Sequence, residues 1–65
     1  MFMLIKSPAS GQLKEAFDVL DEVFGTSEFT EGQAVNSIQV GLEVETGQAQ
    51  TIFASLKRNE NIGEV

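Results

Sequence analysis

Residues 29–58 read FTEGQAVNSIQVGLEVETGQAQTIFASLKR, a stretch that predicts two helices joined by a short turn. Thr30 followed by Gln33 fits a capping box, in which each side chain bonds a free backbone N–H of the first helical turn. Phe29, just before this cap, is placed to pack on Ala34 as a hydrophobic staple. The positions expected on the buried face of the first helix are Ala34, Val35, Ile38 and Leu42.

The second helical pattern of this stretch runs from Thr46 to Arg58, with Thr46 or Glu45 as its cap. Gly41, near the end of the preceding helix, weakens that helix by up to about 1 kcal/mol relative to alanine. Lys57 and Arg58 fall in the last turn of the second pattern, where cations suit the helix dipole. Its apolar positions are Ala49, Ile52, Phe53 and Leu56.

A further helical pattern comes earlier in the chain and ends at Gly25, which adopts a left-handed backbone at little cost. Ser7 or Ser10 is placed to cap its start. Pro8 suits a first-turn position, because its missing N–H would be unpaired there. The apolar stripe of this helix holds Leu13, Ala16, Phe17, Leu20, Val23 and Phe24.

The two ends of the chain hold the strand candidates, Met1–Ile5 and Ile62–Val65, with a turn expected at 59–61. Because a lone short strand does not persist, we expect the ends to pair. Met1–Ile5 then completes the core; the alternative is an exposed apolar patch that joins two copies in a homodimer. The patterns predict a mainly α fold, with a three-helix core and short terminal strands, in one domain over residues 1–65.

The composition excludes several classes of function. The chain has 65 residues, 4 of them basic and 10 acidic, a net charge of −6, and no Cys, His or Tyr. Disulfides and the usual zinc sites are therefore absent, and few of the common nucleophiles and general bases remain. We expect no enzymatic activity, no cofactor and no metal. The carboxylates of the first helix are expected to form a solvated face, or else a surface for a weakly held divalent cation or a basic partner: Glu15, Asp18, Asp21 and Glu22.

No stretch approaches the roughly 20 apolar residues that a membrane-spanning helix needs. Met1–Ile5 has no basic stretch before it and no small-residue cleavage site after it, so we do not expect a signal peptide. A cytoplasmic setting without a membrane partner follows by default.

The charges are unevenly distributed along the chain. Residues 1–45 carry eight acids and two bases, residues 46–59 two bases and no acid, and residues 60–65 two acids. Glutamine pairs with adenine, hydroxyls meet bases or phosphates, and Lys and Arg meet phosphates or guanine, so this acid-free helix suits DNA. The alternative is an ordinary helix surface whose cations only complement the dipole. The candidate DNA-binding residues are Thr46, Gly47, Gln48, Gln50, Thr51, Ser55, Lys57 and Arg58.

The apolar spacing over about residues 13–65 resembles that of the winged helix-turn-helix superfamily. The resemblance lies in three segments: Phe29-Thr30-Glu31-Gly32-Gln33-Ala34, Leu42-Glu43-Val44-Glu45-Thr46-Gly47-Gln48-Ala49 and Leu56-Lys57-Arg58-Asn59-Glu60-Asn61-Ile62. They correspond to the start of the second helix, the turn into the recognition helix and the exit into the wing. Glu43 stands where a glycine is often found, and the sequence ends at Val65, so we expect a truncated wing.

The resemblance implies a helix-turn-helix core of winged-helix type and a small DNA-binding protein, a transcription regulator. Because one chain offers only two cations to phosphates, we expect it to bind as a dimer. It implies that Lys57 and Arg58 meet phosphates and that five residues face bases: Thr46, Gly47, Gln48, Gln50 and Thr51. One alternative is an acidic three-helix protein-interaction module without DNA binding, which uses the first helix and the off-face Val19 and Val40. Another is that the acidity reflects a high-salt habitat.

Overall fold

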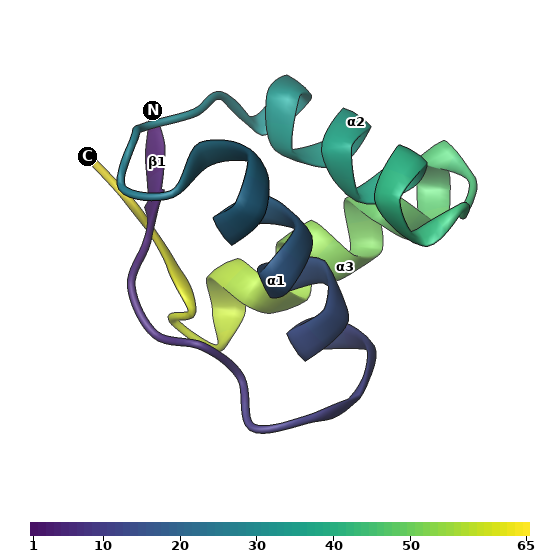
Figure 1. The fold of residues 1–65 in the computed structure, drawn as a ribbon, viewed down its shortest axis with the longest axis horizontal. Coiled ribbons are helices and arrows are strands. Elements are labelled where there is room, and N and C mark those ends of the chain that lie inside the picture. Colours follow the sequence, from purple (N-terminus) through teal and green to yellow (C-terminus); the bar gives the residue numbers. More distant parts are fainter.

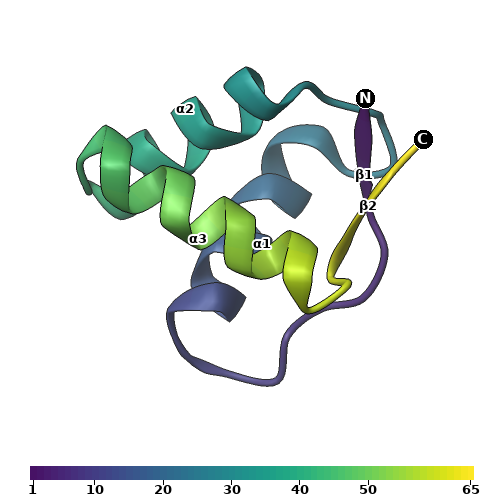
Figure 2. The same ribbon diagram turned by 180° about the vertical axis from the view of Figure 1, so that it is seen from behind.

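Three helices enclose a single core in the computed structural model, which describes residues 1–65 (Figure 1). The elements are β1 (Phe2–Leu4), α1 (Gly11–Phe24), α2 (Glu31–Leu42), α3 (Thr46–Arg58) and β2 (Ile62–Glu64). The helix α3 lies behind α1 in Figure 1 and in front of it in Figure 2, while α2 lies above both. The expected mainly α fold, with a three-helix core and short terminal strands, is confirmed.

The core consists of one apolar stripe from each helix together with Phe29 and Ile62. The helical spacing identified these stripes correctly except at Val23, which is 58% exposed. In the last turn of α1, Phe24 takes the inward position instead, and its ring stacks on Phe29 at a centroid distance of 4.8 Å. The twelve buried core residues are Ala16, Phe17, Leu20, Phe29, Ala34, Val35, Ile38, Ala49, Ile52, Phe53, Leu56 and Ile62.

The starts of α1 and α2 are capped differently. Thr30 Oγ1 accepts the Gln33 N–H at 3.1 Å and Gln33 Oε1 accepts the Thr30 N–H at 2.8 Å, so the predicted capping box is confirmed. Ser10 is the N-cap of α1, but its hydroxyl makes no capping hydrogen bond. The expectation that Pro8 lies in the first turn is wrong, because the chain becomes helical only from Gly11.

The turn between α2 and α3 depends on an unusual backbone conformation at Glu43. This residue has φ 56° and ψ 48°, the left-handed conformation in which glycine often ends a helix. Its N–H bonds the Gln39 carbonyl, which ends α2. Glu45 is the N-cap of α3 without a side-chain bond; the Thr46 hydroxyl instead donates to Gln39 Oε1 at 3.0 Å.

The chain ends form a small antiparallel sheet, as expected, with Phe2 opposite Glu64 and Leu4 opposite Ile62. On its other side β1 meets Phe29, whose N–H and carbonyl both bond Phe2. The N-terminal segment therefore runs between two other extended segments, and Phe2 and Leu4 pack against the core. The termini lie side by side in both views (Figures 1 and 2).

Asn61 links the segment after β1 to the exit of α3. Its side-chain amide donates to the Lys6 carbonyl at 2.8 Å, and its carbonyl accepts the N–H of Ile5 at 2.9 Å and of Lys6 at 3.3 Å. The residue is only 8% exposed and is the one buried polar residue of the chain. This contact closes the three-helix core at the end opposite the α2–α3 turn.

Candidate nucleic-acid interface

The residues expected to contact DNA lie along α3, on the sides that the core does not cover. Seven of the eight are exposed and Ser55 is half-buried. Because successive helical residues are turned by about 100°, the set covers roughly 200° of the circumference, more than one groove wall can contact. The residues form three lines along the axis: Thr46, Gln50 and Lys57 on one flank, Gly47, Thr51 and Arg58 in the middle, and Gln48 and Ser55 on the other flank.

The hydroxyl groups of α3 are held by neighbouring groups. Thr51 Oγ1 donates to the Gly47 carbonyl at 3.0 Å, and Thr46 Oγ1 donates to Gln39 Oε1 at 3.0 Å. Because each hydroxyl already donates its proton to a protein oxygen, the two threonine oxygens can act toward a ligand only as acceptors. The chemistry of this half of α3 therefore rests mainly on the exposed amides of Gln48 and Gln50.

The two cations at the end of α3 both contact the protein itself. Lys57 Nζ lies 5.4 Å from the ring centroid of Phe2 and 5.3 Å from that of Phe53. These two rings meet edge to face with 5.3 Å between centroids, so Lys57 sits on an aromatic pair that joins β1 to α3. Arg58 Nη2 donates to Ser55 Oγ at 3.2 Å. Moving Lys57 toward a phosphate costs its cation–π contacts, about 0.5–1 kcal/mol at an exposed site.

A hollow of about 440 Å³ lies between α2 and the start of α3. The sequence had not singled out its α2 wall, although Asn36 and Gln39 are spaced i, i+3 and thus share one side of that helix. Gly32, which lies beside them and has no side chain to fill the space, also indicated a hollow at this side of α2. The lining residues are Glu31, Gly32, Val35, Asn36, Gln39, Thr46 and Gln50.

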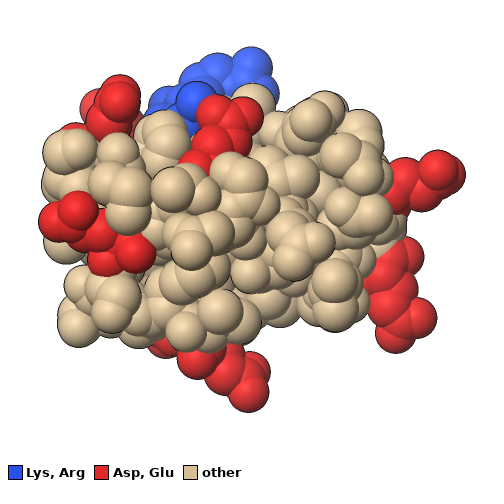
Figure 3. All heavy atoms as spheres, turned by 90° about the horizontal axis from the view of Figure 1, so that it is seen from above, with Lys and Arg blue, Asp and Glu red and all other residues tan.

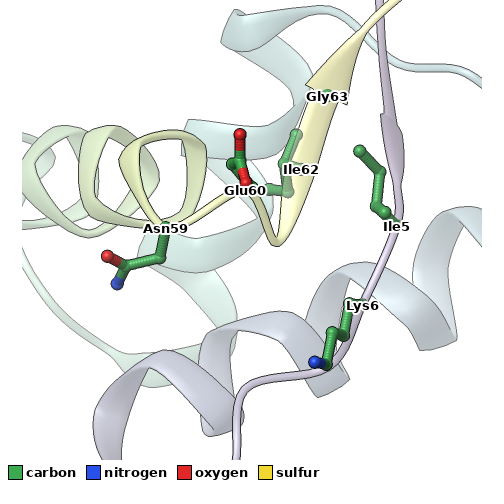
Figure 4. Close-up of a pocket in the computed structure, with 6 residues that line it drawn as sticks. All are labelled: Ile5, Lys6, Asn59, Glu60, Ile62 and Gly63. Carbon is green, nitrogen blue, oxygen red and sulfur yellow. The ribbon is translucent and has the colours of Figure 1, made fainter.

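A second hollow, of about 490 Å³, lies beside the C-terminal end of α3 (Figure 4). Ile5 and Lys6 contribute from the segment after β1, and Asn59, Glu60, Ile62 and Gly63 from the α3 exit and β2. The Ile5 side chain packs over Gly63, and a β-carbon at Gly63 would require the end of that side chain to move. This hollow has one cation and one carboxylate and is separate from the α2–α3 hollow.

The acidic side chains surround the candidate interface without lying on α3. On the face over α2, uncharged atoms fill the middle and most acidic side chains lie toward the rim (Figure 3). One group of basic atoms is visible, with an acidic side chain beside it. Along the chain, Glu43 and Glu45 precede α3 and Glu60 follows it. Four acids lie on α1, where Asp18 pairs with Lys14 at 3.2 Å. α3 is thus the one helix of the three without an acidic side chain.

No three acidic side chains lie close enough together to hold a metal ion. None of the helices is both long and apolar enough to cross a lipid bilayer. Comparison with protein-family models, with curated proteins and with solved structures found no match.

Proposed function

We propose that the chain is a small DNA-binding protein of winged-helix type, a transcription regulator that uses α3 as its recognition helix. The observation that carries the proposal is the distribution of charge. In a chain of net charge −6, α3 has no acid, and its exposed sides present amides, hydroxyls and two cations. DNA binding also fits the cytoplasmic setting expected from the sequence.

The dimensions of α3 fit a major groove. Its 13 residues give a rod about 20 Å long, and a major groove about 12 Å wide admits a helix. The Thr46–Gln39 hydrogen bond fixes the start of α3 against α2, which would lie across the groove edge. In this arrangement the exposed residues at the start of α3 face base edges, and Lys57 and Arg58 meet phosphates. The base-facing residues are Thr46, Gly47, Gln48, Gln50 and Thr51.

The affinity of one chain is low in this proposal. Two phosphate contacts correspond to a salt slope of about −2, whereas strong binders make about 6–10 such contacts. A homodimer doubles the contacts. Its proposed contact is the outer side of the terminal sheet, where Met1, Ile5 and Val65 remain 50%, 62% and 58% exposed. Analytical ultracentrifugation with and without DNA tests this part.

The proposal is tested by titrating labelled random-sequence duplex at low and moderate salt. Arg58→Glu should weaken binding, because it places an acid on the docking helix. Lys14→Glu is the matched control: it changes the net charge equally but lies on α1. Equal losses in both variants, or no retention of duplex by the wild-type chain at low salt, would refute docking through α3.

A second candidate function is binding of a basic protein partner through α1 and α2. It is favoured by the exposed carboxylates of Glu15, Asp21 and Glu22 and by Val40, which is 70% exposed. Val19, expected to share this role, is instead half-buried against Gly41. Capture from nuclease-treated lysate, comparing the wild type with the triple variant Glu15→Gln, Asp21→Asn, Glu22→Gln, tests it. A partner lost from the variant, with no DNA bound by the wild type, favours this candidate.

A further inference from the structure

The hollow between α2 and α3 has polar walls over an apolar floor. Asn36 and Gln39 stand on the α2 wall, Thr46 and Gln50 on the α3 wall, and the buried Val35 lies at the base. The hydrogen bond from Thr46 to Gln39 connects the two walls. Because Gln39 accepts this bond through Oε1, its NH₂ group keeps its donors for a ligand.

The amides of this hollow match one base better than the others. Asn36 and Gln50 are exposed, and each carries an acceptor and a donor side by side. Adenine presents the complementary pair in the major groove, the N7 acceptor and the N6 donor, and is read bidentately by asparagine and glutamine.

The hollow contains no cation with which to read guanine. Guanine presents two acceptors, N7 and O6, and is recognised mainly by arginine or lysine. Arg58 lies eight residues beyond Gln50, or about 12 Å along the helix axis, and Lys57 sits over Phe2 and Phe53. The one charged residue of the hollow is Glu31, which repels phosphate.

We propose that the α2–α3 hollow selects A·T base pairs, with Asn36 and Gln50 as the adenine-contacting residues. The inference rests on the proposed DNA binding, and it extends the base-reading surface from α3 to α2. The separation of about 12 Å between Gln50 and Arg58 corresponds to about three to four base pairs, at a rise of about 3.4 Å per base pair. Arg58 therefore meets the backbone or a guanine at that distance from the adenine that Gln50 contacts.

The test is selection from a randomised duplex pool at low salt, followed by sequencing of the retained duplexes. The chains compared are the wild type, Asn36→Ala, Gln50→Ala and the control Gln12→Ala, which removes an exposed amide from α1. We expect the wild type to enrich a short run of A·T pairs. Each hollow variant should lower the preference at one position by roughly 5- to 150-fold, the discrimination of one bidentate contact. Gln12→Ala should keep the preference.

The outcomes separate this inference from DNA binding itself. Retained duplexes without A·T enrichment, or an unchanged preference in both hollow variants, overturn the A·T assignment and leave DNA binding in place. If the wild type retains no duplex, both proposals fail. Asn36 and Gln50 are exposed, so the alanine variants should stay folded, which circular dichroism verifies.

Discussion

Gly41 of α2 lies so close to Val19 of α1 that a β-carbon at Gly41 would stand 2.8 Å from both γ-carbons of Val19. The sequence predicts only that Gly41 weakens its helix and that Val19 lies off the buried face of its own helix. In the structure Val19 packs directly on Gly41, across the interface between α1 and α2. The glycine is therefore required by packing, and Val19 is not free to bind a partner.

Gly41→Ala should destabilise the protein although alanine is the better helix former. The gain of about 1 kcal/mol in helix propensity is opposed by an overpacking cost of about 1–3 kcal/mol. Since both γ-carbons of Val19 are in the way, rotation of its side chain gives no escape. Thermal unfolding followed by circular dichroism measures the effect.

Gly32→Ala is the matched control in the same helix, because the nearest atom to its β-carbon is 3.9 Å away. It should stabilise by up to about 1 kcal/mol. Val19→Ala added to Gly41→Ala should recover part of the loss, since Val19 Cβ itself would lie at 3.3 Å. A higher melting temperature for Gly41→Ala alone would contradict the packing argument.

Glu43→Gly should stabilise the protein by about 0.5–1 kcal/mol. Glu43 has a left-handed backbone, which costs a residue with a β-carbon about 1–2 kcal/mol, part of which the greater flexibility of glycine in the unfolded chain offsets. Glu45→Gly removes the same charge two residues later, at an N-cap of ordinary φ −80°, and should change stability by only a few tenths of a kcal/mol. Urea unfolding distinguishes the two; equal shifts would point to charge instead of backbone strain.

Asn61→Ala should cost about 0.5–1.5 kcal/mol and loosen the segment after β1. The substitution removes the hydrogen bond of 2.8 Å that the Asn61 amide donates to the Lys6 carbonyl. Amide hydrogen exchange at Ile5 and Lys6 should speed up relative to α2. Asn59→Ala, two residues earlier and exposed, is the control and should leave exchange unchanged. Uniform acceleration throughout the chain would indicate global destabilisation instead of local release.

Lys57→Met should cost about 0.5–1 kcal/mol, because it keeps the aliphatic stem over Phe2 and Phe53 but removes the charge. Arg58→Met removes the same charge from a residue bonded only to Ser55 and should be nearly neutral. Denaturant midpoints of the two variants give the comparison. A larger loss of stability for Arg58→Met than for Lys57→Met would contradict the predicted cation–π contribution of Lys57.

Raising the salt concentration should increase stability. The chain has a net charge of −6, and on α1 Glu15, Asp18 and Asp21 repel one another at i, i+3 spacing. Salt near 1 M shortens the screening length to about 3 Å and weakens this repulsion. Melting temperatures from 10 mM to 1 M NaCl test it. A steep rise of the melting temperature with salt favours the alternative that the acidity reflects a high-salt habitat. An unchanged melting temperature contradicts the predicted stabilisation by salt.

Much of the helix layout could be predicted because its determinants are local. The Thr30–Gln33 capping box and the apolar period of residues 46–58 depend on residues three or four positions apart, and both the cap and the bounds of α3 are confirmed. Pro8 and Val23 were misplaced because their positions depend on where α1 meets the rest of the core. The pairing of the chain ends was expected from the instability of a lone strand and is confirmed.

The sequence by itself thus determined the helices, their buried faces and the acid-free character of α3, since helical period and charge order are properties of neighbouring residues. The tertiary structure alone decided that Val19 packs on Gly41, that Lys57 sits over Phe2 and that Asn36 joins Gln50 in one hollow. Each of these contacts joins two different elements. Such contacts arise from the distance and angle at which packed elements meet, and no local period in the chain encodes that geometry.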